Sequence, residues 1–252
     1  VDFIAPDLYD DGFKGWAAQY HLHNNPLFIP EIRHTQNNGV RAFYVFGEHN
    51  ALGFSPFAIE DGSDEQGTPF VEGYEKLREI MPLVTGWQGK DAMWGLLFDQ
   101  NDKERIIEDG SLVLTCRHNF TLPWDPRATD GSVWPEGGGI IIRIAENEYI
   151  VAGNGIVVEF ATASEKAFGK AAESLGEDGF ASAGSKGIGT PGRKAWKGTR
   201  CGIGSVDEVK VNADGSFSYI RRLNGDQDHQ GRHVRISVGD YKTLYVRLYE
   251  YQ

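Results

Sequence analysis

The sequence predicts an α/β region followed by an all-β region, and three observations support this fold class. Residues 1–89 alternate short apolar runs with stretches of helical periodicity, a pattern typical of parallel βα units. After about residue 90 the apolar runs are short, β-rich and separated by Gly, Asn and Asp. The chain has 252 residues, 40% of them hydrophobic, which suffices for one large or two ordinary domains with buried cores. We therefore expect domains at 1–89 and 90–252.

The first region is predicted to contain three strands and three helices in alternation. The expected strands cover 1–9, 26–31 and 51–61, and the expected helices cover 12–22, 37–50 and 68–90. Val71, Tyr74 and Leu77 give the last helix an amphipathic face, and Pro82 or the Gly86 region is expected to end it. Apolar strands of this kind are buried on both faces, as they are in a β/α barrel.

Three βα units are too few to close a barrel, which has eight. The chain also starts abruptly, because the apolar run Val1–Pro6 follows neither an initiator Met nor a charged segment of a signal peptide. We expect that the chain begins inside a domain. Residues 1–89 would then be the C-terminal portion of a (β/α)8 TIM barrel that lacks its N-terminal half.

The second region is expected to be a jelly-roll-like β-sandwich. Asp214 and Gly215 lie between two alternating runs and predict a tight hairpin. Residues 161–200 are rich in Gly, Ala, Ser and Lys, which leaves a short helix and a loop as alternatives. The polar cluster Asp226, Asp228, His229, Arg232 and His233 is interpreted as a hydrogen-bonded loop in preference to a calcium site.

Composition excludes several classes of partner. The formal net charge of −11 disfavours binding to nucleic acid or to an anionic membrane and is compatible with a neutral ligand. No apolar run is long enough to cross a membrane. No metal site is expected, because no carboxylate or cysteine at a known ligand spacing completes the set His21, His23, His34 and His49. Cys116 and Cys201 lie far apart in sequence, so a disulfide between them stays open.

Polar side chains stand where the expected strands end, which is where a β/α barrel carries its active site. Tyr9 follows the first strand and Glu31 ends the second, directly after Pro30. Two interpretations of Glu31 stay open. The rigid strand end holds a functional carboxylate in place, or Glu31 forms an ion pair with a nearby basic residue such as Arg33.

Three stretches carry a resemblance to a known family. YHLHNNPLFIPEIR (20–33) and FYVFGEHNALGFSPFAIED (43–61) resemble the C-terminal barrel region of bacterial β-galactosidases of glycoside hydrolase family 35. GIGSVDEVKVNADGSFSYIRRLNGDQDHQGRHVRI (202–236) resembles the β-sandwich that follows that barrel. The resemblance implies strands six to eight of the barrel in residues 1–89, and a missing N-terminal barrel half in the intact protein.

The resemblance also implies an activity, that of a retaining exo-β-galactosidase, which hydrolyses terminal β-galactosyl residues of oligosaccharides or polysaccharides without a cofactor. Glu31 would be the nucleophile and Tyr9 would orient it. The family's acid/base, an Asn-Glu pair after the fourth strand, has no counterpart here, since Asn147 and Glu148 lie in the all-β region. The chain alone is therefore expected to be inactive. By resemblance the intact enzyme is periplasmic or secreted.

A sugar substrate needs aromatic and hydrogen-bonding partners, and we assign Trp16, Phe57 and Glu60 as candidates. Each has a structural alternative, in the core for the aromatic residues and in a cap or ion pair for Glu60. The tryptophans of the all-β region are interpreted as packing residues in preference to a separate sugar site. Two rival functions stay open: a non-catalytic carbohydrate-binding or accessory β-sandwich module, and a barrel glycosidase acting on another sugar.

Overall fold

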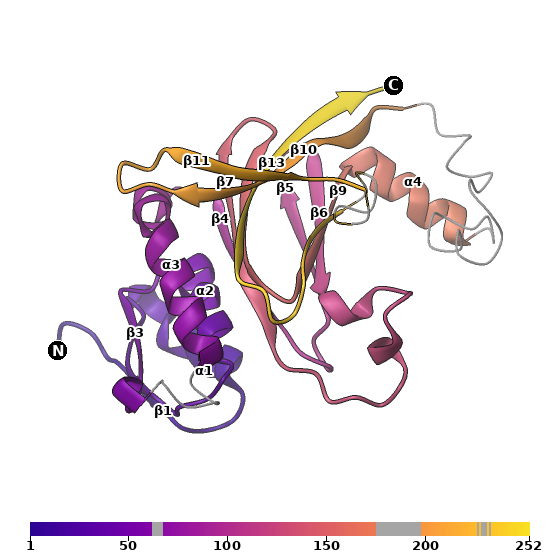
Figure 1. The fold of residues 1–252 in the computed structure, drawn as a ribbon. Coiled ribbons are helices and arrows are strands. Elements are labelled where there is room, and N and C mark those ends of the chain that lie inside the picture. Colours follow the sequence, from indigo (N-terminus) through magenta and orange to yellow (C-terminus); the bar gives the residue numbers. More distant parts are fainter. Residues whose placement is uncertain (62–67, 175–197, 226, 228–230, 232) are drawn as a thin grey trace.

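The structure is a computed structural model that describes residues 1–61, 68–174, 198–225, 227, 231 and 233–252. These residues form successive layers: a three-stranded parallel sheet, a layer of helices, a six-stranded antiparallel sheet and a four-stranded antiparallel sheet (Figure 1). In the described residues no helix is both long and apolar enough to cross a membrane. The expected combination of α/β and antiparallel β structure is therefore present, in the expected order along the chain.

The parallel sheet has the strand order β1-β2-β3, and a helix follows each strand. Its elements are β1 (Asp7–Leu8), α1 (Phe13–Tyr20), η1 (Leu22–Asn24), β2 (Phe28–Ile32), α2 (Asn38–His49), β3 (Gly53–Pro56), η2 (Ile59–Asp61) and α3 (Thr68–Trp87). Strand β2 pairs in parallel with both neighbours. The predicted βα alternation is thus confirmed for these three units. Helix α3 continues through Pro82 and ends beside Gly86.

The first strand is much shorter than predicted. Residues 1–6 belong to no strand, although their composition is apolar. The backbone of Ile4 is held by a side chain instead: its N–H donates to Oδ1 of Asn25 at 2.8 Å, and its carbonyl accepts from Nδ2 of Asn25 at 2.9 Å. An amide side chain thus replaces the neighbouring strand as the partner of this backbone.

The antiparallel part begins after α3 and contains two sheets, ordered β11-β10-β13-β8-β7-β4 and β12-β9-β6-β5. Its elements are β4 (Met93–Phe98), β5 (Glu104–Asp109), β6 (Leu112–His118), η3 (Asn119–Thr121), η4 (Pro126–Ala128), β7 (Gly137–Ala145), β8 (Glu148–Asn154), β9 (Ile156–Thr162), α4 (Ala163–Ser174), β10 (Arg200–Val211), β11 (Phe217–Leu223), β12 (Val234–Ile236) and β13 (Lys242–Tyr251). Buried side chains from both sheets form one shared hydrophobic core.

Several local predictions for the antiparallel part can be compared with the structure. The hairpin at Asp214 and Gly215 is confirmed, since Asn212 N–H donates to the carbonyl of Ser216 between paired strands β10 and β11. Asn147 lies at the turn between β7 and β8 with a positive φ of 58°. The open disulfide is settled, because Cys116 and Cys201 are both free and buried. Most of the polar cluster around residues 226–232 lies outside the described residues, as does Trp196.

Helix α2 lies directly on the six-stranded sheet, and glycines permit the close contact. A Cβ atom on Gly95 of β4 would lie 2.2 Å from the carbonyl oxygen of Tyr44 in α2. A Cβ atom on Gly47 would lie 2.8 Å from Cα of Gly95. The helices and the sheet share a single hydrophobic core, which fixes the α/β part against the antiparallel part.

Ion pairs reinforce this junction along one side. Among the described residues, three of them join residues 1–89 to the antiparallel part: Arg41–Glu136, Lys14–Asp102 and Glu48–Arg105. The Arg41 pair is bidentate, with distances of 2.7 and 2.6 Å from Nε and Nη2 to the Glu136 carboxylate. This geometry is the strong form of an arginine–carboxylate contact.

Candidate functional site

Tyr9 and Glu31 come together at the end of the parallel sheet. Glu31 lies in β2 and Tyr9 follows β1, and Asp7 of β1 is the register partner of Glu31. The phenol of Tyr9 donates a short hydrogen bond to Oε1 of Glu31. Glu31 is half-buried, and Arg33 donates instead to the backbone carbonyl of Tyr9. Among the described residues, no ion pair joins Glu31 to Arg33 or to another basic side chain, so the structure gives the ion-pair interpretation no support.

The electrostatics of the pair follow from this contact. The hydrogen bond to Glu31 raises the pKa of Tyr9 to about 12, with smaller contributions from burial and from the charges of Glu31 and Asp7. The phenol therefore stays protonated at any physiological pH and can only donate to Glu31. A carboxylate oriented by a fixed donor, with its second oxygen uncommitted, suits nucleophilic or general-base chemistry.

Phe57 lies at the same edge of the sheet. Its backbone N–H donates to the carbonyl of Ile32 at 2.8 Å, which places it beside the end of β2, and its ring is exposed. Its carbonyl is 3.2 Å from Nδ1 of His34. Phe57 is thus an exposed aromatic residue whose backbone lies beside the end of β2, one residue after Glu31.

His34 was not predicted as part of this edge. Its ring packs edge-on against Phe70, with centroids 4.9 Å apart. Its Nε2 atom is buried and has no hydrogen-bond partner in the described part of the chain. The only sequence signal for His34 was its position three residues after Glu31, because the contact to Phe57 forms only in the fold.

The other two predicted substrate residues lie apart from the Tyr9–Glu31 pair. Trp16 is partly exposed on α1, whose buried residues are Phe13 and Ala17. Glu60 is exposed in η2 at the border of the described residues. Within the described residues, no hydrogen bond or ring contact joins Trp16 or Glu60 to the pair, so neither has a role assigned by geometry.

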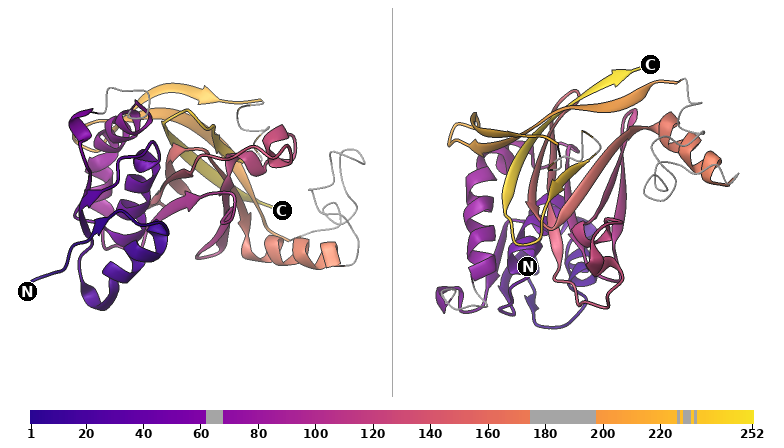
Figure 2. Two further views of the ribbon diagram at one scale, coloured as in Figure 1. Left: turned by 90° about the horizontal axis from the view of Figure 1, so that it is seen from below. Right: turned by 45° about the vertical axis from the view of Figure 1, so that its right-hand side comes forward.

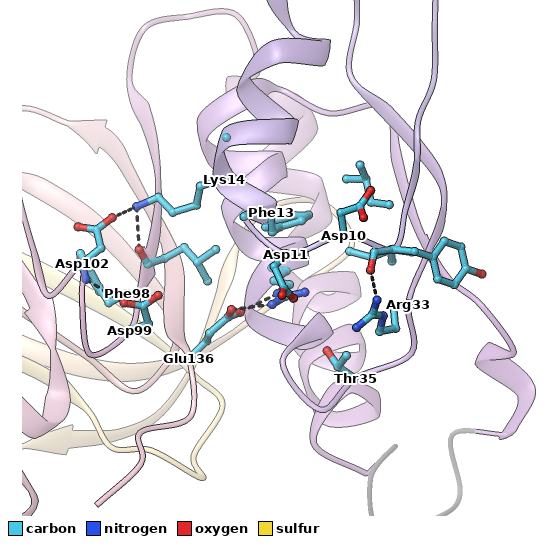
Figure 3. Close-up of a pocket in the computed structure, with 17 residues that line it drawn as sticks. Asp10, Asp11, Phe13, Lys14, Arg33, Thr35, Phe98, Asp99, Asp102 and Glu136 are labelled. Carbon is cyan, nitrogen blue, oxygen red and sulfur yellow. Dashed lines mark hydrogen bonds and ion pairs between the residues drawn. The ribbon is translucent and has the colours of Figure 1, made fainter. Parts of the chain in front are cut away.

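A cavity of about 360 Å³ lies between the helix layer and the antiparallel part (Figure 3). Residues of the turn after β1, the turn after β2 and the loop after β4 line it. Lys14 spans it, donating to the carbonyl of Leu97 at 3.1 Å and pairing with Asp102. Figure 3 shows Glu136 directed from the sheet toward the helices. Tyr9 lines the cavity but Glu31 does not, so the cavity is separate from the candidate nucleophile.

The cavity is lined by both acidic and basic side chains. Its polar lining comprises Asp10, Asp11, Lys14, Arg33, Thr35, Arg41, Asp99, Asp102 and Glu136. Several of these groups are already paired with each other, so the cavity offers hydrogen bonds more than free charge. In the part of the chain that the structure describes, no three His, Cys, Asp or Glu side chains are grouped so that they could hold a metal ion.

A protein family described as a domain of unknown function, DUF5597, matches residues 70–235, which run from α3 to β12. Tyr9 and Glu31 precede the matched segment. Comparison with curated proteins found no match. Because the match covers well over half of the sequence, the chain belongs to the DUF5597 family.

Proposed function

We propose that this chain is the C-terminal part of a retaining β-galactosidase of the family 35 type, with Glu31 as the nucleophile. The single observation that carries the proposal is the hydrogen bond from Tyr9 to Glu31 at the carboxyl ends of adjacent parallel strands. In β/α barrels these strand ends carry the catalytic residues. The resemblance of residues 20–33 and 43–61 to that family supports the same assignment.

The fold is proposed to be the end of a (β/α)8 barrel followed by a jelly-roll-like sandwich. Strands β1, β2 and β3 are consecutive neighbours, parallel, and each followed by a helix, as barrel units are. Among the described residues, strands β1 and β3 each pair on one side only. Exposed apolar side chains such as Phe3, Leu52 and Phe57 lie around them. We propose that an N-terminal barrel half pairs with these edges in the intact protein.

The proposed mechanism has two steps. Glu31 attacks the anomeric carbon of a terminal β-galactoside, and the bond to the leaving oxygen breaks as an acid outside this chain protonates that oxygen. Water, activated by the same group as a base, then hydrolyses the galactosyl ester and releases Glu31. Tyr9 holds the carboxylate in one orientation during both steps, and Phe57 offers an apolar face to the sugar.

Covalent trapping tests this proposal. The full-length native protein is treated with a 2-deoxy-2-fluoro-β-galactoside that carries a dinitrophenyl leaving group, because the fluorine slows hydrolysis of the ester. We expect one fluorogalactosyl group per chain, on the peptide that contains Glu31. The isolated 252-residue chain should neither label nor turn over substrate.

The outcomes separate the candidate functions. A label on a different carboxylate would overturn the role of Glu31 while keeping the glycosidase. A Glu31→Gln variant of the full-length protein serves as the matched control and should not label. If the native protein takes no label but still binds sugar, an accessory carbohydrate-binding function replaces the enzyme.

A further inference from the structure

Helices α2 and α3 pack on one face of the six-stranded sheet. Along β10 and β13 this face extends past the helices. On β13, Tyr245 packs against the core beneath the helices, whereas Leu244 and Leu248 belong to the core between the two sheets. Since side chains alternate along a strand, Tyr249 and Tyr251 share the face of Tyr245. Figures 1 and 2 show the C-terminal end of β13 directed away from α1, α2 and α3.

Tyr249 and Tyr251 form an exposed aromatic pair on this face. Their ring centroids are 5.5 Å apart, with an angle of 34° between the planes, and the residues are 50% and 40% exposed. Within the described residues, neither hydroxyl makes a hydrogen bond. In contrast, the hydroxyls of Tyr9, Tyr149 and Tyr245 each donate to a carboxylate. The two rings therefore keep their hydroxyls and part of their ring surface open to solvent.

The backbone beneath Tyr249 is adapted to hold its ring flat. Gly202 of β10 is the register partner of Tyr249. A Cβ atom on Gly202 would lie 2.5 Å from Cζ and 2.7 Å from Cε1 of the Tyr249 ring. The ring thus lies against the strand itself, a close approach that only glycine permits. Tyr249 is supported from below while its outer surface stays open to solvent.

Arginine donors lie on the same face of the sheet, next to Tyr245, since Cζ of Arg247 is 5.4 Å from the centroid of the Tyr245 ring. Arg247 precedes Tyr249 on the same face, and its guanidinium donates to Oγ of Ser205 at 2.8 Å and to Asp207 at 3.0 Å. Asp207 also accepts two hydrogen bonds from Arg222. Each guanidinium carries five N–H groups, so donors remain on both arginines, whose side chains are about half exposed.

We propose that this surface, made by Tyr249, Tyr251 and Arg247, binds a neutral oligosaccharide. The axial C–H groups of a pyranose ring form a flat apolar face that stacks on an aromatic ring, while its hydroxyls accept hydrogen bonds from nearby donors. Two neighbouring rings would contact successive sugar units. The net charge of −11 disfavours an anionic polymer, so a neutral chain is the expected ligand.

A second copy of the chain is a less suitable occupant. A stable protein interface buries about 800 Å² on each partner. Two half-exposed tyrosine rings and an arginine offer much less, because a whole aromatic side chain buries only about 150–250 Å². The surface lies at the opposite end of the molecule from β1, so sugar binding here does not depend on the chemistry proposed for Glu31 (Figure 1).

Titration calorimetry of the 252-residue chain with β-1,4-galactotetraose and with cellotetraose tests the proposal. We expect saturable binding of at least one of them. Tyr249→Ala and Tyr251→Ala should each weaken binding at least tenfold, whereas Tyr249→Phe should bind within twofold of the parent because stacking uses the ring. Tyr219→Ala removes an exposed tyrosine of β11 and should bind like the parent. Glu31→Gln should also leave binding unchanged, which separates this site from the proposed active site.

Several results would overturn the proposal. One is that the parent chain binds neither sugar. Another is that both alanine variants bind sugar as tightly as the parent and keep its melting temperature. Sedimentation analysis supplies a further test. If the parent forms a dimer that Tyr249→Ala dissociates, and sugar has no effect, this surface joins two copies and does not bind sugar.

Discussion

The phenol of Tyr9 donates a hydrogen bond to the carboxylate of Glu31, although the two residues lie 22 positions apart in the chain. The contact exists because β1 and β2 are parallel neighbours, with Asp7 and Glu31 in register. Adjacent parallel strands end at the same edge, so residues that follow them converge. The pair is thus a direct product of the βα topology, and its properties can be tested without any substrate.

The titration of Tyr9 should report its contact with Glu31. The hydrogen bond and the nearby negative charges disfavour the phenolate and raise the pKa of Tyr9 to about 12. In Glu31→Gln the main carboxylate is lost, so the pKa of Tyr9 should fall toward the ordinary value of about 10. NMR titration of ¹³C-labelled tyrosine, with Tyr9 assigned from Tyr9→Phe, measures the change. Asp7→Asn should lower it less, and an unchanged pKa in Glu31→Gln would contradict the contact.

Removal of the Tyr9 hydroxyl should slow catalysis in the full-length enzyme. A hydrogen bond to a charged group both orients and stabilises it, so we expect a loss of roughly 10- to 100-fold in rate for Tyr9→Phe. The loss should be seen in kcat/KM and in the rate of labelling by the fluorogalactoside. Tyr20→Phe is a matched control on α1 and should retain the parent rates. Parent-like labelling in Tyr9→Phe would show that Tyr9 does not orient the nucleophile.

The junction between α2 and β4 should tolerate no side chain at Gly95. A Cβ atom there would lie 2.2 Å from the Tyr44 carbonyl and 2.7 Å from the Glu48 nitrogen, both backbone atoms of α2. Gly95→Ala should therefore lower the free energy of unfolding by about 1–3 kcal/mol, as measured in urea. Gly86→Ala, at an exposed site of α3 with no atom within 4 Å, should raise it by about 0.5–1 kcal/mol. Equal effects would contradict the packing described.

The sequence predicted the βα alternation because helical and strand periodicities are local and differ clearly. It did not predict the short β1. The apolar run of residues 1–6 is compatible with a strand, and only the fold brings Asn25 to the Ile4 backbone. Glu31 and Tyr9 could be predicted because each follows or ends a recognisable strand. His34 could not, since its partner Phe57 belongs to the next unit.

The exposure of Tyr249 and Tyr251 could likewise be predicted only in part from the sequence. The alternation in β13 is visible in the sequence, and it assigns both tyrosines to one face. Whether that face is covered depends on where the helices of residues 1–89 pack on the sheet. Helix α3 contacts β10 and β13 only in part, and this long-range arrangement leaves no trace in local periodicity.

The bidentate pair Arg41–Glu136 should contribute measurably to stability. Both side chains are less than one fifth exposed, so the pair is partly shielded from solvent. A double-mutant cycle with Arg41→Met and Glu136→Gln should give a coupling free energy of about 1–3 kcal/mol. The same cycle on Lys242 and Asp240, a more exposed pair, should give less than about 1 kcal/mol. Coupling near zero for Arg41 would mean that packing alone holds the junction.

His118 should make the protein sensitive to acid. Its ring is fully buried, Nε2 donates to the Pro135 carbonyl at 3.0 Å, and Nδ1 accepts from Phe120 N–H at 3.1 Å. Both nitrogens are occupied in the neutral ring, and burial lowers the pKa of His118 to about 4. In the unfolded chain a histidine titrates near 6.5. The unfolded state therefore binds a proton first, and stability falls as the pH drops from about 6.5 to 4.

The size of this acid effect can be measured against a variant that cannot titrate. A difference of about 2.5 pKa units corresponds to a loss on the order of 3 kcal/mol between pH 7.5 and 4. His118→Asn keeps an acceptor for the Phe120 N–H, so it should fold with lower stability at pH 7.5 but lose less of it on acidification. Burial also lowers the pKa of His49 to about 4, but that residue is present in both proteins and cancels in the comparison. Urea unfolding at pH 7.5, 6.0, 5.0 and 4.5 gives both curves. Parallel curves would mean that His118 takes up its proton without unfolding, which requires its ring to leave the contacts with Pro135 and Phe120.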